Sequence, residues 1–180
     1  MIYVMLANGF EEIEALAFTD ILRRAGVDTK TVSIYKDHLV EGSHGIVIKA
    51  DLCADEVECD KMTGIILPGG LPGTYNLRDC DTVKNMLEYA TVNNKLMGAI
   101  CAAPYVFDVY GYLNGKKSTV NPGFVDEMKN AELTDERVVI DGNIITSQGP
   151  GTAHEFAAAV ISALKGDNSA DELLKEMLYK

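Results

Sequence analysis

The chain has 180 residues, 47% hydrophobic and 24% charged, a composition typical of a globular protein rather than a disordered or collagen-like one. Asp and Glu number 27 against 16 Lys and Arg, so the formal net charge is −11. A field of this sign repels nucleic-acid phosphates and anionic lipid headgroups, which argues against nucleic-acid binding and against docking on such membranes.

Short apolar runs alternate with longer stretches of helical periodicity, the pattern of βα units on a parallel sheet. Strands are predicted at Ile2–Ala7, Val27–Ile34, Gly64–Leu67 and Leu96–Ile100, with hairpins formed by His38–Val40 and Ile46–Lys49 and by Val138–Ile140 and Ile144–Thr146. Helices are predicted at Glu11–Ala25, Asp81–Asn93, Ala102–Tyr110, Ala153–Leu164 and from Ser169 onward. We therefore expect an α/β fold with a mostly parallel central sheet. Since we find no repeat or linker, we expect one domain over residues 1–180.

Targeting, metal-binding and nucleotide-binding motifs are not found in the sequence. No apolar run approaches the roughly 20 residues that span a bilayer, and the first residues lack the basic and apolar segments of a secretory signal. The four cysteines contain no C-x-x-C pair and are accompanied by only three histidines, a poor framework for zinc or disulfides. No glycine-rich nucleotide-binding motif is present. We expect a cytoplasmic protein without metal or cofactor, in which Cys53, Cys59 and Cys80 are structural or surface thiols.

Three of the predicted strands end in chemically unusual residues. The first strand leads through Asn8-Gly9-Phe10 to Glu14, the strand at Gly64–Leu67 ends in Pro68-Gly69-Gly70, and the next strand ends at Cys101. Ligands of open parallel sheets bind at the carboxyl ends of the strands. We therefore expect these three segments to meet at one site.

Glu14 is predicted to lie near the middle of the apolar face of its helix. On a helical wheel Glu14 aligns with Phe18 and Ile21, whereas Glu12 points to the opposite side. A carboxylate in that position is poorly solvated, so we expect the pKa of Glu14 to be raised, which suits a general acid. The alternative is that the helix dipole favours acids in a first turn, but this does not account for an acid at the centre of the apolar stripe.

Cys101 stands between a predicted strand and a predicted helix among small residues, an arrangement like a nucleophile elbow. A thiol at a helix N-terminus meets free N–H groups and positive partial charge, so we expect a lowered pKa and a reactive thiolate. Backbone N–H groups of Gly69, Gly70 and Ala102 could stabilise an oxyanion, although a Gly-Gly pair is also typical of a plain turn. The alternative for Cys101 is a buried, inert thiol.

The remaining polar residues carry weaker predictions. His38 lies in a predicted hairpin and is expected to be solvated, and His154 lies in a first helical turn and is expected to be structural. His44 stays a candidate accessory residue. Gly149-Pro150-Gly151 is predicted to form a tight turn, and Pro150 could also wall the site because the turn follows a strand.

Five segments occur in a specific order over nearly the whole chain: Gly9-Phe-Glu-Glu-Ile-Glu14, Arg23-Arg-Ala-Gly26, Leu67-Pro-Gly-Gly70, Ala99-Ile-Cys-Ala-Ala-Pro104 and Ser147-Gln-Gly-Pro-Gly-Thr152. In residues and spacing the chain resembles the ThiJ/PfpI family of the class I glutamine amidotransferase-like superfamily, and more narrowly its parkinsonism-associated deglycase branch. The resemblance implies a flavodoxin-like three-layer α/β sandwich, usually a homodimer. It also implies that Cys101 is the elbow nucleophile, Glu14 the acid that hydrogen-bonds it, and Gly70 and Ala102 the backbone donors.

The chain departs from the family pattern at two positions. Asn121 stands where the branch often has a histidine, and Ala102 stands where the peptidase branch has a histidine directly after the nucleophile. Without a histidine partner the thiol lacks the base for peptide hydrolysis, which argues against a protease. His44 aligns roughly with a basic residue that in the family reaches the site of the partner subunit, so a contribution across a dimer is a further expectation.

The resemblance implies two functions for Cys101 and Glu14. The first is cofactor-free turnover of small reactive aldehydes such as methylglyoxal, of the glyoxalase III or deglycase type, which we expect here with a small-molecule carbonyl substrate. The alternative is an oxidative-stress sensor or protective chaperone-like protein, in which protonated Glu14 stabilises a Cys101 sulfinate without turnover. An interaction module with an inert cysteine is the third possibility.

Overall fold

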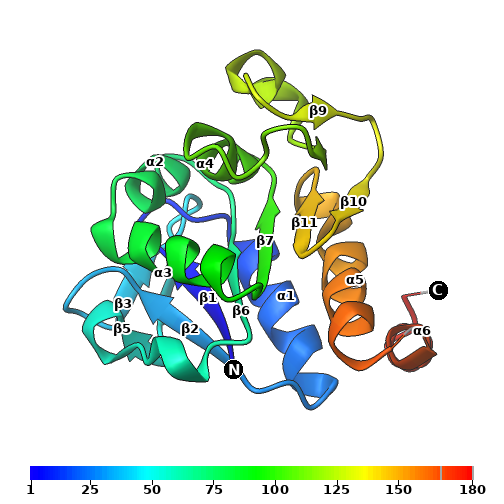
Figure 1. The fold of residues 1–180 in the computed structure, drawn as a ribbon. Helices are drawn as coiled ribbons and strands as arrows, with labels where there is room; N and C mark the ends of the chain where they lie inside the picture. Colours follow the sequence, from blue (N-terminus) through cyan, green and yellow to red (C-terminus); the bar gives the residue numbers. More distant parts are fainter. Residues whose placement is uncertain (167, 180) are drawn as a thin grey trace.

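The computed structural model describes residues 1–166 and 168–179 and shows a twisted sheet with helices on both faces (Figure 1). Seven strands form this sheet in the order β10-β11-β7-β6-β1-β2-β5. They are β1 (Ile2–Leu6), β2 (Thr29–Ser33), β5 (Leu52–Cys53), β6 (Gly64–Leu67), β7 (Leu96–Ile100), β10 (Val138–Asp141) and β11 (Ile144–Ser147). Neighbouring strands pair in parallel except β10, which runs antiparallel to β11. The predicted flavodoxin-like α/β sandwich is confirmed.

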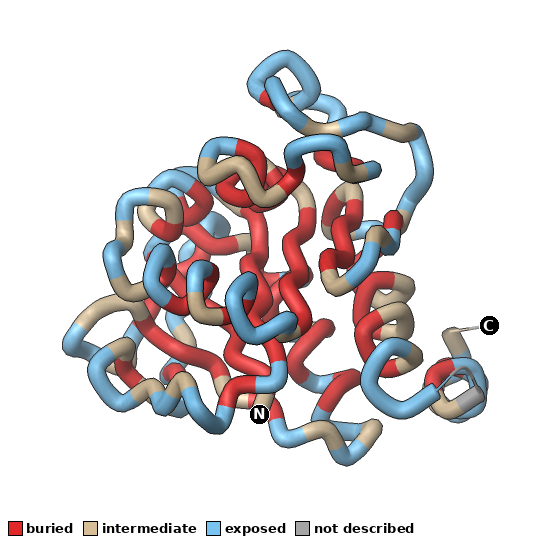
Figure 2. Tube along the Cα trace, viewed as in Figure 1, coloured by how far each residue is buried: buried red, intermediate tan, exposed pale blue. Residues whose placement is uncertain are grey.

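Helices form the two outer layers. The α-helices are α1 (Glu12–Arg24), α2 (Gly73–Arg78), α3 (Asp81–Val92), α4 (Pro104–Val109), α5 (Ala153–Lys165) and α6 (Asn168–Glu176). Successive side chains of β1 point to opposite faces of the sheet. Tyr3 and Met5 pack with α3 and α4 on one face, whereas Ile2 and Val4 pack with α1 and α5 on the other. Figure 2 shows the resulting core, with buried residues along the central strands and on the helix faces turned toward them. In the described part of the chain, no helix has the length and apolar character needed to cross a membrane.

Smaller elements decorate the sandwich. The hairpin of β3 (Leu39–Glu41) and β4 (Val47–Lys49) forms as predicted, while β8 (Lys117–Ser118) and β9 (Glu132–Leu133) make a short parallel pair. Short 3-10 helices are η1 (Ala54–Glu56), η2 (Cys59–Lys61), η3 (Pro122–Glu127) and η4 (Pro150–Thr152). The sequence predicts neither α2, β5 nor the β8–β9 pair, because each is too short to show a periodic hydrophobic pattern.

The chain order creates a crevice at one end of the sheet. After β1 the chain adds β2 on one side, and it later returns to add β6 on the other side of β1. Ligand sites of doubly wound sheets lie at such a switch point, outside the carboxyl ends of the strands. β7 ends at the same edge, near the top of Figure 1, where the chain turns into α4.

A buried aspartate holds the segments that flank this edge. The Asp108 side chain is 1% exposed and accepts hydrogen bonds from the backbone N–H groups of Lys129 (2.7 Å), Asn130 (3.0 Å) and Ala131 (2.9 Å). Charge-assisted hydrogen bonds of this kind contribute about 1.5–3 kcal/mol each. Since α4 follows Cys101 and η3 follows Asn121, Asp108 fixes the relative position of both segments.

Candidate active site

The three strand ends meet as predicted. The N–H of Gly69, just after β6, donates a hydrogen bond to Oε2 of Glu14 at 2.7 Å. A Cβ atom at Gly69 would lie 2.6 Å from Cβ of Cys101 and 2.9 Å from that carboxylate oxygen, so the three residues are in contact. Glycine at position 69 is what allows the carboxyl of α1 and the thiol after β7 to approach each other.

Cys101 occupies a strained turn. Its φ of +62° lies in the left-handed region, which costs of order 1–3 kcal/mol for a residue other than glycine. Two main-chain bonds hold this conformation: its N–H donates to the carbonyl of Ser147 (2.9 Å), and its carbonyl accepts from the N–H of Asn121 (2.8 Å). The helix begins only at Pro104, two residues later than predicted, because residues 101–103 form the turn that presents the thiol.

The Glu14 carboxyl is buried and binds a proton near neutral pH. The residue is 1% exposed, and burial raises the pKa of Glu14 to about 7, against the lowering effect of the Gly69 N–H and the Cys101 thiol. Oε1 of Glu14 has no hydrogen-bond partner among the described residues. The predicted rise in the pKa of Glu14 follows from the predicted cause, its place on the buried face of α1.

The predicted lowering of the Cys101 pKa is wrong. Burial, the negative charge of Glu14 and its hydrogen bond raise the pKa of the Cys101 thiol to about 12, more than the N–H groups of Ala102 and Gly70 lower it. The sequence argument fails because burial of the thiol and the neighbouring carboxylate outweigh the backbone N–H groups. When Glu14 is protonated, its charge no longer opposes the thiolate and its O–H can donate to the sulfur. Near neutral pH the thiol therefore keeps its proton, while the carboxyl beside it gains and loses one.

The proposed backbone donors differ in what they contact. Gly69 is excluded as an oxyanion donor because its N–H is committed to Glu14. The N–H groups of Gly70 and Ala102 instead lower the pKa of the Cys101 thiol. Gly70 has a φ of +89°, and a Cβ atom there would lie 2.4 Å from the backbone N of Glu11. A side chain at position 70 would collide with the backbone of residues 9–11 and so displace the N–H of residue 70 from its place beside Cys101.

Asn121 and Pro150 border the site without offering a base. Oδ1 of Asn121 accepts from the N–H of Gly123 (3.0 Å), and its Nδ2 donates to the carbonyl of Gln148 (3.4 Å). An amide cannot accept a proton near neutral pH, so Asn121 supports the turn instead of acting as a histidine would. Pro150 begins η4, three residues after Ser147, whose carbonyl binds the N–H of Cys101.

His44 lies in the loop between β3 and β4, beside the first residues of α1. Its Nδ1 lies 2.8 Å from Oε2 of Glu12 and 3.6 Å from Oε2 of Glu11, while its side chain is 67% exposed. Hydrogen bonding to Glu12 raises the pKa of His44. Burial opposes ionisation of Glu12, but the hydrogen bonds from His44 and from backbone N–H groups lower the pKa of Glu12 to about 2. One atom of each of these three residues lies within 4.8 Å of the other two, so the group has the composition of a metal site.

Glu12 is a residue whose burial the sequence does not predict. It is predicted to point away from the apolar face, and it does, yet it is 5% exposed because the β3–β4 hairpin covers it. A Cβ atom at Gly42 would lie 2.3 Å from the Glu12 carboxyl, and the N–H of His44 donates to it at 2.8 Å. The hydrophobic pattern of α1 identifies the side of the helix that packs on the sheet. It cannot show that a hairpin about 30 residues later in the chain covers the opposite side.

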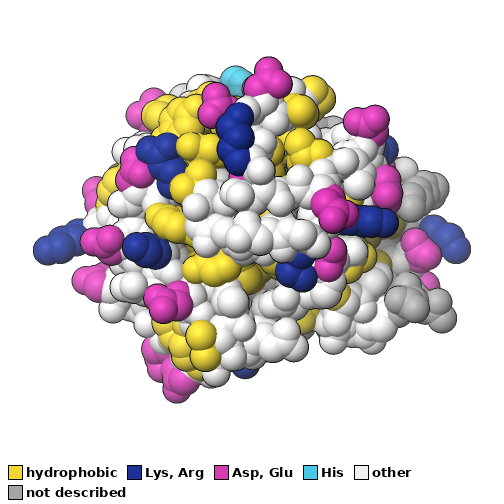
Figure 3. Space-filling model, turned by 45° about the horizontal axis from the view of Figure 1, so that its top comes forward, with side chains coloured by type: hydrophobic (Ala, Val, Ile, Leu, Met, Phe, Trp, Pro, Cys, Tyr) yellow, Lys and Arg dark blue, Asp and Glu magenta, His cyan; other side chains and the backbone are white. Residues whose placement is uncertain are grey.

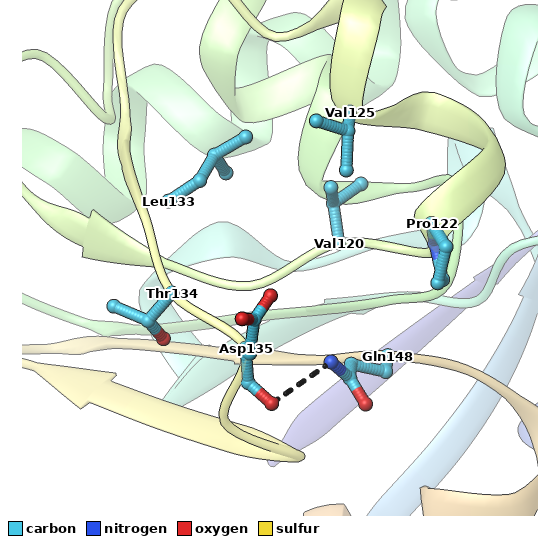
Figure 4. A pocket seen from close by; sticks show the side chains of 7 residues that line it. All are labelled: Val120, Pro122, Val125, Leu133, Thr134, Asp135 and Gln148. Atoms are coloured by element: carbon cyan, nitrogen blue, oxygen red, sulfur yellow. Dashed lines mark hydrogen bonds between the residues drawn. The ribbon is translucent and has the colours of Figure 1, made fainter.

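A cavity adjoins the site on the Asn121 side. Figure 4 shows apolar side chains on one side of it and the hydrogen bond from Gln148 Nε2 to the Asp135 carbonyl (3.2 Å) on the other. Its lining residues are Val120, Pro122, Val125, Leu133, Thr134, Asp135 and Gln148. Figure 3 turns the top of Figure 1 forward and shows hydrophobic side chains gathered in its upper part, with acidic and basic ones interspersed around them. Glu14 and Cys101 do not line this cavity, which neighbours Asn121 in sequence through Val120 and Pro122.

Comparisons with known proteins show which family the chain resembles over most of its length. A family model described as "DJ-1/PfpI family" matches residues 1–163. "Protein DJ-1 homolog A" of Arabidopsis thaliana is 41% identical over 98% of the chain, which spans only 45% of that relative's length. "Glutathione-independent glyoxalase DJR-1.2" of Caenorhabditis elegans is 32% identical, with 93% of this chain and 89% of the relative covered. The solved structure "Toxoplasma gondii DJ-1, oxidized" superposes with a TM-score of 0.94 at 35% identity, covering 98% of this chain and 97% of the other.

Replacing Glu14 with Gln should change how stability depends on pH. The folded-state pKa of about 7 lies above the ordinary 4.5, so Glu14 contributes stability that is fully present below about pH 4.5 and is lost as pH rises through about 7. The loss is about 3 kcal/mol, which Glu14→Gln should not show because an amide does not titrate. Urea unfolding of both proteins at about pH 4.5 and pH 8 measures the difference, with Glu88→Gln on exposed α3 as the control. Equal pH profiles would contradict a neutral Glu14.

Proposed function

The chain belongs to the DJ-1/PfpI family, and from this premise we propose that it converts small reactive aldehydes of the methylglyoxal type without a cofactor. The observation that carries the proposal is the buried pair of Glu14 and Cys101, in which a carboxyl with a pKa of about 7 holds a proton beside the thiol. The relative named as a glutathione-independent glyoxalase supports this class of reaction. Deglycase-type hydrolysis of aldehyde adducts would use the same pair.

The first half of the reaction forms a carbon–sulfur bond. The Cys101 thiol gives its proton to the Glu14 carboxylate as the sulfur adds to the aldehyde carbon. The N–H groups of Gly70 and Ala102, which lower the pKa of the thiol, would also stabilise the oxygen that becomes negative. Glu14 then passes its proton to this oxygen, which leaves a neutral hemithioacetal and a carboxylate.

The second half moves a proton between carbons. The Glu14 carboxylate removes the hydrogen of the former aldehyde carbon as a proton and returns it to the adjacent carbonyl carbon. The hydroxyl proton on the former aldehyde carbon passes to the oxygen of that adjacent carbon, so the first carbon becomes the thioester carbonyl and the second carries the hydroxyl. One carbon is thereby oxidised and its neighbour reduced, so no external oxidant or reductant is needed. The product is a lactate thioester on Cys101, and attack by water releases lactate and restores the thiol.

We also propose that two copies associate through the face formed by α1 and the β3–β4 hairpin. Four large apolar side chains on this face are about half exposed: Ile13 (55%), Leu39 (55%), Ile46 (52%) and Val47 (54%). The N–H of Ile46 lies 3.5 Å from Oε1 of Glu12, which joins the hairpin and α1 into one surface. An exposed apolar patch of this kind is typical of an interface. The same face carries His44, so association would bring that side chain against the partner.

A second function, oxidation sensing, is favoured by the same neutral carboxyl. A protonated Glu14 can donate a hydrogen bond to a sulfinate at Cys101, and the Toxoplasma neighbour is described in an oxidized form. Each of two peroxide molecules would transfer one oxygen to the sulfur and leave as water. This function needs no turnover of an aldehyde.

Lactate production tests the first function. Wild-type protein should form lactate from methylglyoxal, and Cys101→Ser should lose this activity because a hydroxyl is a far weaker nucleophile. Glu14→Gln should keep the fold and lose about 10²–10⁴-fold in turnover, the usual contribution of a general acid–base. Cys80→Ser, which changes a thiol outside the site, serves as the control. Lactate formation that does not depend on Cys101 would refute the mechanism.

Peroxide treatment tests the second function. Mass spectrometry of peptides after mild treatment should find two added oxygen atoms on Cys101 before Cys53, Cys59 or Cys80 is modified. The reason is that Cys101 alone among the four combines partial exposure with a protonated carboxyl to stabilise the sulfinate. Earlier oxidation of any of the other three thiols would rule out a sensor at this site.

Sedimentation tests the association. Wild-type protein should sediment as a dimer, and Ile46→Lys should shift it toward monomer because a charge would be buried in the interface. Val92→Lys, at a residue 78% exposed on α3 and distant in sequence from this face, should leave the dimer intact. A monomeric wild type, or a dimer unaffected by Ile46→Lys, would place the interface elsewhere or exclude it.

A further inference from the structure

A second group of chemically active side chains lies apart from Cys101. A ring nitrogen of His38, the sulfur of Cys53 and a carboxylate oxygen of Glu56 all lie within 4.8 Å of one another. His38 precedes β3, Cys53 ends β5, and Glu56 belongs to η1. The proposed function uses none of them. Their contacts also correct the prediction that His38 is merely solvated.

The orientation of His38 leaves one ring nitrogen free. Its Nδ1 lies 3.0 Å from the carbonyl of Ala50, an acceptor only, so Nδ1 carries the hydrogen and Nε2 carries the lone pair. The backbone fixes this pair, since the N–H of Ala50 donates to the His38 carbonyl at 2.8 Å. A histidine that donates one ring N–H to a backbone carbonyl is the usual arrangement of a metal ligand. Nε2 faces Oε2 of Glu56 at 3.7 Å.

Cys53 and Glu56 are held together by the backbone. The N–H of Cys53 donates to Oε2 of Glu56 at 2.7 Å, which fixes the carboxylate beside the thiol. Cys53 is 4% exposed, whereas His38 and Glu56 keep side-chain exposures of 37% and 49%, so an ion could enter from solvent on their side. Burial and the carboxylates of Glu56, Asp55 and Asp37 raise the pKa of the Cys53 thiol. This excess of negative charge favours a cation, which would reverse the effect on the thiol.

We propose that His38 Nε2, Cys53 Sγ and the Glu56 carboxylate bind a divalent transition-metal ion of the Zn²⁺ class, with water in the fourth position. Metal–ligand bonds of about 2.0–2.3 Å at tetrahedral angles place ligand atoms about 3.3–3.8 Å apart. The 3.7 Å between His38 Nε2 and Glu56 Oε2 is within a few tenths of an ångström of the separation of about 3.3–3.6 Å that a nitrogen and an oxygen ligand would have. Nitrogen and sulfur ligands select Zn²⁺ or Co²⁺ over Mg²⁺ or Ca²⁺. On binding, the Cys53 thiol loses its proton to solvent as the metal–sulfur bond forms.

Cobalt titration tests the site directly. After treatment with reductant and chelator, the full-length protein should develop a thiolate-to-Co²⁺ charge-transfer band, which one equivalent of Zn²⁺ abolishes. Cys53→Ser should lose the band. His38→Asn should weaken Co²⁺ binding at least about tenfold, because the Asn amide can keep the bond to Ala50 but offers no nitrogen in place of Nε2. Circular dichroism checks that both variants fold.

Two control variants separate this site from the other thiols. Cys59→Ser and Cys101→Ser should both keep the Co²⁺ band, since neither residue belongs to the group. The proposal is overturned if the wild type shows no band, if the band survives Cys53→Ser, or if it disappears in Cys101→Ser. Because Cys101→Ser should abolish lactate production and keep the cobalt band, the two proposals can fail independently.

Discussion

One proton in a buried space determines the chemistry of this edge of the sheet. Glu14 is buried and Cys101 only partly exposed, and two negative charges side by side in that environment are strongly disfavoured. The pair therefore keeps at least one proton near neutral pH. The N–H of Gly69 stabilises the carboxylate, while those of Gly70 and Ala102 favour the thiolate. Both proposed functions, acid–base work on an aldehyde and protection of an oxidised sulfur, would use the protonated form of Glu14.

The fold supplies the geometry for this pair through three independent strands. β1, β6 and β7 are neighbours in the order β7-β6-β1, so the segments that follow them reach the same edge. Residues without side chains let these segments touch, since a Cβ at Gly69 would meet both Cys101 and Glu14. Rigid strands rather than long loops thus hold the reacting groups, which limits the reorganisation needed when a substrate enters.

Features that depend on the local sequence pattern could be predicted, whereas burial caused by segments distant in sequence could not. β6 and β7 begin and end as predicted because both are continuous apolar runs between turn residues. Glu14 could be singled out because its helix has a clear apolar face. Glu12 could not, since its burial comes from a hairpin whose position the helical pattern does not encode. The direction of the Cys101 pKa shift is also not predictable from the local sequence, because it follows from burial of the thiol and from the charge of Glu14, which a remote helix supplies.

The left-handed backbone of Cys101 has a consequence for how the sequence can change. Glycine adopts a φ of +62° without penalty, so at this position it would relieve strain that cysteine carries. Folding alone would thus favour losing the sulfur, and the hydrogen bonds to Ser147 and Asn121 would survive because they belong to the main chain. The sulfur therefore contributes nothing that the fold of this turn requires, and stabilising substitutions at position 101 would remove it.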